Sequence, residues 1–134
     1  MLVLETERIL LRRMNMDDVE NLQGIFSDPE VAFCGANEQE LCERGVVFHC
    51  AKYHFADHGK SMCIGEIHGF VKLIAAKESG EILGGSVVGP HASELIHEIV
   101  VAMGFRATVK QLAEIPHYHP TLSEIWTYPA EELM

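Results

Sequence analysis

The chain has 134 residues, enough for one domain with a single hydrophobic core that needs no disulfide bonds. Hydrophobic residues make up 48% and charged residues 22%, which is ordinary for a globular protein and excludes a disordered or fibrous chain. Asp and Glu number 20 against 10 Lys and Arg, and the resulting net charge of −10 argues against nucleic acid or an anionic membrane as a partner.

The opening residues, from Leu2 to Arg13, are rich in Leu, Val and Ile and predict a strand. Asn15 is a good helix N-cap, and apolar residues at helical spacing up to Phe26 predict a helix after it. Charged residues within the first 13 positions argue against a signal peptide, and no apolar run approaches transmembrane length. We therefore expect a cytoplasmic protein that does not bind membranes.

The middle of the chain alternates strand and helix patterns. The expected elements, in order, are a strand at 31–34, a helix capped by Asn37 and ending at Gly45, a strand at 46–55, a loop at 57–60, a hairpin of strands at 70–76 and 82–88, a helix at 92–103, and a short helix capped by Thr108. Strands that follow one another, with helices gathered around them, predict an α+β fold in which an antiparallel sheet has flanking helices.

Four cysteines occur in the chain, and none forms a Cys-x-x-Cys pair. We expect them to be reduced and mostly buried. Cys50, His54, His58 and Cys63 have side chains that could bind zinc. However, the predicted strand places Cys50 and His54 on one face and leaves His58 in a loop, whereas closed zinc sites draw paired ligands from short knuckles. We therefore expect no metal site.

The sequence from His117 to Glu124 places an imidazole, His119, directly before Pro120 and a carboxylate, Glu124, five residues further on. The fixed φ of Pro120 predicts the start of a helix, which should falter at Pro129. A carboxylate that orients a histidine can form an acid/base pair. The alternative is that Thr121 and Glu124 form a capping box for this helix.

Five segments resemble, in order, the C-terminal dimerisation domain of the pyridine nucleotide–disulfide oxidoreductases, in the form found in dihydrolipoamide dehydrogenases. They are Asp28-Pro29-Glu30-Val31-Ala32 with Gly35, Gly69-Phe70-Val71-Lys72-Leu73-Ile74-Ala75, Gly80-Glu81-Ile82-Leu83-Gly84, Val88-Gly89-Pro90-His91-Ala92-Ser93-Glu94-Leu95-Ile96, and His117-x-His119-Pro120-Thr121-Leu122-Ser123-Glu124. The resemblance implies that His119 and Glu124 are a catalytic dyad reaching the partner subunit's flavin across a dimer. It also implies FAD and NAD as cofactors of the full-length enzymes.

Residues 1–27 are similar instead to the first strand and helix of a GCN5-related N-acetyltransferase. Both resemblances include Phe26 to Ala32, so the chain is chimera-like, with a join at this segment. We therefore expect two parts, an N-terminal strand–helix arm at 1–25 and a dimerisation-like domain at 26–134. No glycine-rich turn for a coenzyme pyrophosphate follows the arm, so we expect no acetyl transfer.

The sequence contains no GxGxxG turn and no close pair of redox cysteines. We therefore expect the chain itself to bind no cofactor and to have no oxidoreductase activity alone. The favoured hypothesis is a detached interface domain, an association module that forms a homodimer and in which His119 and Glu124 are idle. The alternative is a half-site subunit that donates this pair to a separate FAD-dependent flavoprotein.

Overall fold

The structure is a computed structural model that describes residues 2–5, 10–12 and 28–134. The first two ranges are the strands β1 (Leu2–Glu5) and β2 (Leu10–Arg12), which pair antiparallel with each other. The prediction of one strand from Leu2 to Arg13 is therefore wrong. The polar residues Glu5 to Arg8, between two apolar stretches, are the sequence signal that separates the strands. The helix predicted after Asn15 lies outside the described residues.

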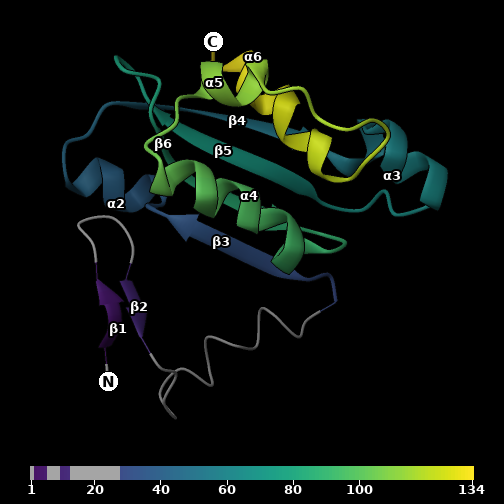
Figure 1. The fold of residues 1–134 in the computed structure, drawn as a ribbon, viewed down its shortest axis with the longest axis horizontal. Coiled ribbons are helices and arrows are strands. Elements are labelled where there is room, and N and C mark those ends of the chain that lie inside the picture. Colours follow the sequence, from purple (N-terminus) through teal and green to yellow (C-terminus); the bar gives the residue numbers. More distant parts are fainter. Residues whose placement is uncertain (1, 6–9, 13–27) are drawn as a thin grey trace.

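Four antiparallel strands form the main sheet in the order β3-β6-β5-β4. Their bounds are Val31–Gly35 for β3, Phe48–His54 for β4, Phe70–Ala76 for β5 and Ile82–Val88 for β6. β4, β5 and β6 follow one another as a meander, and β3 pairs with the free side of β6 (Figure 1). In the described part of the chain, β1 and β2 do not belong to this sheet.

The helices that form the core cover one face of the sheet. Helix α4 (Ala92–Gly104) packs on β3 and β6, and α6 (Thr127–Glu132) packs on β4 and β5 (Figure 1). Helix α5 (Val109–Glu114) contacts α6, and the 3₁₀ helix η3 (Ser123–Trp126) precedes α6. The fully buried Trp126 donates its indole N–H to the carbonyl oxygen of Leu95, 3.0 Å away, which ties η3 to α4. The predicted α+β fold with an antiparallel sheet is confirmed.

The close approach of α4 to the sheet depends on Gly85 in β6. A Cβ added at Gly85 would lie 3.1 Å from Cγ2 of Ile99 and 3.5 Å from the Trp126 ring. A Cβ on neighbouring Gly84 would meet the backbone of Ala36 and Cys34. The pairing of β5 with β6 also shifts register between Ile74 and Ala75. Neighbouring backbone and side chains therefore pack closely against Gly84 and Gly85.

Two short helices begin at the predicted capping boxes. In α2 (Glu38–Glu43), the Asn37 side chain accepts a hydrogen bond from the backbone N–H of Glu40, whose carboxylate accepts from the backbone N–H of Asn37, each at 2.9 Å. Thr108 and Gln111 make the same exchange at the start of α5. Both predictions are confirmed, because each box satisfies two backbone donors that the helix leaves unpaired.

Two predicted segments differ in the structure. The loop expected at 57–60 lies instead within the 3₁₀ helix η2 (Phe55–Asp57) and the helix α3 (Gly59–Ile64), which ends where Gly65 adopts a φ of 79°. No helix begins at Pro120: η3 starts at Ser123. Pro129 lies in the first turn of α6, where the missing proline N–H has no helical partner to lose. Pro129 therefore marks the start of that helix and not the point where it falters.

The expectation that the cysteines are mostly buried is wrong. All four are free, but Cys42, Cys50 and Cys63 are exposed and only Cys34 is partly buried. Cys50 lies on the β4 face whose alternate residues, Lys52 and His54, are also exposed, so its position on the strand directs the thiol outward. No helix among the described residues is long and apolar enough to cross a membrane.

Candidate functional site

The structure joins the two predicted site residues directly. Nδ1 of His119 lies 2.9 Å from Oε2 of Glu124, a normal length for a charge-assisted hydrogen bond. The Glu124 side chain is only 10% exposed, whereas the His119 side chain is 79% exposed. Thr121 bonds the Ser123 hydroxyl instead of capping a helix. Glu124 therefore bonds His119, and the capping box is not formed.

The second carboxylate oxygen of Glu124 faces a histidine that the sequence analysis assigned to a loop. Nε2 of His58 lies 3.5 Å from Oε1 of Glu124, and Nδ1 of His58 lies 2.9 Å from the Ser61 hydroxyl in α3. His58 and Ser61 are fully buried. The only sequence signal for this contact is the polar pair His58 and Ser61, three residues apart at the start of a short helix.

Burial lowers the pKa of His58, and the nearby His119 lowers it further, whereas the Glu124 carboxylate opposes the shift. His58 is therefore neutral around pH 7. Tyr128 of α6 closes this side of the site, since its ring stands edge-on to His58 with 6.0 Å between ring centroids. Tyr128 itself stacks on Tyr53 of β4 at 4.1 Å. One carboxylate thus lies between an exposed imidazole and an enclosed one.

A separate histidine–glutamate pair holds the loop that carries His119. Nε2 of His117 lies 2.6 Å from Oε1 of Glu98 in α4, and Nδ1 of His117 lies 2.9 Å from the carbonyl oxygen of Ile115. Both ring nitrogens therefore face oxygen atoms, one of a carboxylate and one of the backbone. This pair positions the loop and leaves His119 as the imidazole presented to solvent.

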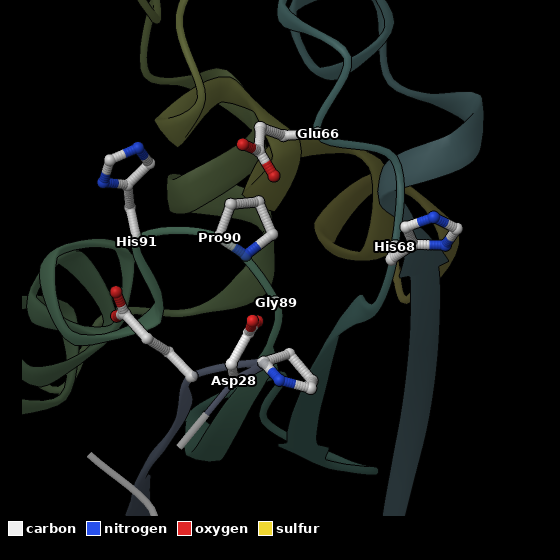
Figure 2. Close-up of a pocket in the computed structure, with 8 residues that line it drawn as sticks. Asp28, Glu66, His68, Gly89, Pro90 and His91 are labelled. Carbon is white, nitrogen blue, oxygen red and sulfur yellow. The ribbon is translucent and has the colours of Figure 1, made fainter. Parts of the chain in front are cut away.

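A pocket of about 590 Å³ lies elsewhere on the domain, and Figure 2 shows its lining. The lining residues are Asp28, Pro29, Glu30, Glu66, His68, Gly89, Pro90 and His91. The Glu66 carboxylate points towards Pro90, with His68 and His91 on opposite sides (Figure 2). The carboxylate of Glu30 accepts hydrogen bonds from the backbone and hydroxyl of Ser93. None of the sequence-predicted site residues lines this pocket.

Gly84, Gly85 and Gly89 do not form a phosphate-binding turn. A phosphate-binding turn needs glycines whose missing side chains leave room for the ligand. A Cβ on Gly84, Gly85 or Gly89 would instead meet atoms of the protein, including the Phe55 ring 2.7 Å from the Gly89 position. The space at these glycines is therefore filled from within the domain.

The possible zinc ligands are also not brought together. In the described part of the chain, no group of three or more His, Cys, Asp or Glu side chains could hold a metal ion. Of the four residues considered, His58 contacts Ser61 and Glu124, and the exposed Cys50 donates to Glu38.

The family model and the similar proteins indicate the same family. The family model described as "Pyridine nucleotide-disulphide oxidoreductase, dimerisation domain" matches residues 23–130. Dihydrolipoyl dehydrogenase of Geobacillus stearothermophilus is 39% identical over 80% of this chain and 23% of its own length. The mitochondrial dihydrolipoyl dehydrogenase of Pisum sativum is 37% identical over 80% of this chain and 22% of its own length. The chain thus spans less than a quarter of these relatives.

Solved structures show the same fold. LpdA from Mycobacterium tuberculosis matches with a TM-score of 0.76 and 34% identity, over 82% of this chain and 24% of that protein. The flavoprotein disulfide reductase RclA from Escherichia coli matches with a TM-score of 0.75 at 20% identity, over 80% of this chain and 25% of that protein. The second match supports the fold alone.

Proposed function

Since the chain belongs to the family of pyridine nucleotide-disulphide oxidoreductase dimerisation domains, we propose that it is an association module that forms a twofold homodimer. The observation that carries this proposal is the family match over residues 23–130. Exposed apolar side chains on α4 and in the loop before η3 support it. Phe105, at the end of α4, is 84% exposed, Val101 is 46% exposed, and Tyr118, between His117 and His119, is 83% exposed. Burying such residues against a second copy is worth about 25 cal/mol per Å².

Light scattering coupled to gel filtration tests the homodimer. The whole chain should elute as a dimer, and Tyr118→Asp combined with Phe105→Asp should convert it to a folded monomer. Val47→Asp is the matched control, because Val47 is also exposed, at 65%, but lies before β4 and outside the proposed contact. A well-folded monomer at micromolar concentration for the unmodified chain would refute the proposal.

The division into an arm at 1–25 and a domain at 26–134 is part of the same proposal. We expect the arm to be structural and without acetyltransferase activity, and we expect the protein to be cytoplasmic, although the Pisum sativum relative is mitochondrial. A chain that starts at Ile25 should be less stable or less dimeric than the whole chain. A truncation as stable and as dimeric as the parent would show that the arm is dispensable.

The chain alone should not catalyse oxidoreduction, because acid–base assistance by His119 and Glu124 helps only a reacting group within hydrogen-bond reach. An assay with dihydrolipoamide, added FAD and NAD should show only background turnover. Turnover well above the background of the His119→Gln variant would contradict the association module.

A half-site subunit is a second candidate, and a specific observation favours it. The bond from His119 to Glu124 is formed at 2.9 Å, and His119 is 79% exposed, so the dyad has the geometry needed to act on a docked protein. Adding the chain to a flavin-dependent disulfide oxidoreductase that lacks its own dimerisation domain should raise its activity. His119→Gln should remove this activation without weakening the association.

A further inference from the structure

The dyad has a buried neighbour, His58, that lies outside the His117–Glu124 motif. Glu124 presents one carboxylate oxygen to His119 and the other to His58. We propose that His58 is a positioning residue for the dyad, because it orients the Glu124 carboxylate from the buried side. Ser61, His58, Glu124 and His119 then form one chain of polar contacts, which we call the relay. This inference rests on the proposed role of the His119–Glu124 pair.

The tautomer of His58 follows from its neighbours. A neutral imidazole has one N–H donor and one acceptor nitrogen, and an ionised carboxylate can only accept. If Nδ1 carried the proton, the lone pair of Nε2 would face the Glu124 carboxylate at 3.5 Å, a buried acceptor against an anion. If Nε2 carries it, a donor group lies 3.5 Å from the Glu124 carboxylate, and Nδ1 accepts a hydrogen bond from the Ser61 hydroxyl at 2.9 Å. The second arrangement is the favourable one.

The donor and acceptor of each contact in the relay are therefore defined. The Ser61 hydroxyl donates to Nδ1 of His58, and the protonated Nε2 of His58 lies 3.5 Å from Oε1 of Glu124. On the other side, Nδ1–H of His119 donates to Oε2 of Glu124, which leaves Nε2 of His119 as the nitrogen that meets a docked group. Nε2 of His58 makes no hydrogen bond among the described residues, so at 3.5 Å it acts on Glu124 as a dipole towards an anion.

The surroundings of His58 suit this role. Its ring is completely buried, the burial lowers its pKa and favours the neutral form, and the ring of Tyr128 stands edge-on to it. A neutral ring supplies an oriented N–H without neutralising Glu124. The carboxylate thus keeps its charge for His119 and is held by partners on both oxygens.

The test uses the whole chain labelled with ¹⁵N-histidine, because NMR distinguishes protonated from bare ring nitrogens. At pH 8, His58 should carry its proton on Nε2 and His119 on Nδ1. In His58→Leu, His119 should shift towards a mixture of both tautomers, because Glu124 has lost its second partner. His58→Gln keeps an N–H donor and should retain the Nδ1–H form of His119. His49→Leu is the matched control, since His49 is exposed on β4.

Two outcomes would overturn the proposal. One is a folded His58→Leu variant in which the His119 tautomer is unchanged. The other is a proton on Nδ1 of His58 in the unmodified chain, a measurement that does not depend on whether any variant folds. Neither experiment needs a flavoprotein, so a failure to activate one would refute the half-site candidate and leave the positioning role of His58 to be judged by the NMR result.

Discussion

Nε2 of His117 lies 2.6 Å from Oε1 of Glu98. This contact connects the loop between α5 and η3, which carries His119, to helix α4. The His117 side chain is only 9% exposed, so little water can replace Glu98 as its partner. The exposed His119, two residues further on, therefore projects from an anchored loop. The position of the dyad depends on this contact as well as on its own hydrogen bond.

Replacing Glu98 with Ala should destabilise the domain. The change leaves the nearly buried ring nitrogen of His117 without its acceptor, which costs about 1–3 kcal/mol. Urea unfolding of Glu98→Ala measures this loss. His97→Ala on the same helix is the control, since His97 is exposed and its replacement should change the free energy of unfolding by less than about 0.5 kcal/mol. Equal stabilities of the two variants would contradict the anchoring role.

Gly85 and Gly104 should respond oppositely to the same substitution. In Gly85→Ala the added methyl group lies 3.1 Å from Ile99, and forcing α4 away from the sheet should cost about 1–3 kcal/mol. Gly104→Ala places its methyl group where no atom lies within 4 Å, at the last residue of α4, and should stabilise the helix by about 0.5–1 kcal/mol. Thermal unfolding of both variants checks the difference in sign.

The stability of the domain should fall on the acid side because of His58. Its pKa in the folded state is lowered from the ordinary 6.5, mainly by burial, with Glu124 opposing and His119 adding to the shift. Above pH 6.5 the ring is neutral in both states. Below that pH the unfolded chain binds the proton first, so stability falls by up to about 1.4 kcal/mol per pH unit until the folded ring titrates.

Urea unfolding between pH 7.5 and 5 measures this effect, and His58→Gln isolates it from the other histidines. The variant should show a flatter loss of stability than the unmodified chain as the pH falls through 6.5. Parallel pH profiles would mean that His58 does not titrate differently in the folded and unfolded states.

The cysteines should be alkylated in a definite order. Burial raises the pKa of the Cys34 thiol to about 11 from the ordinary 9.0, so its thiolate fraction at pH 8 is reduced about a hundredfold. Burial and the neighbouring Glu38 also raise the pKa of Cys50. Iodoacetamide should therefore modify the exposed Cys42 and Cys63 first, and Cys34 last. Mass spectrometry of the partly labelled protein gives the order, and early labelling of Cys34 would contradict it.

Local patterns in the sequence predicted those parts of the fold whose partners lie within a few residues. The boxes at Asn37 and Thr108 formed because each needs only the residue three positions later. The β5–β6 hairpin formed for a similar reason, since its strands are joined by a short turn that contains Gly80. For these elements, the interactions between residues close in sequence are enough to predict the observed structure.

The same reasoning failed where distant residues compete. Thr121 and Glu124 have the spacing of a capping box, but the Glu124 carboxylate bonds His119 and faces His58, which lies far earlier in the chain. The position of His58 depends on how α3 and η3 pack, and no local pattern encodes that. The dyad was therefore predictable by motif, whereas its buried neighbour required the structure.

The order of strands in the sheet also favours an order of assembly. β4, β5 and β6 follow one another along the chain, and a short turn joins β5 to β6, whereas β3 pairs Val31 with Val88 at the far end of the meander. Closing that long loop costs more chain entropy, so β3 should join last. Until it does, β6 has an unpaired edge that the β3 of another copy could occupy. The time between formation of the meander and the arrival of β3 is thus the interval in which strand exchange between two chains can begin.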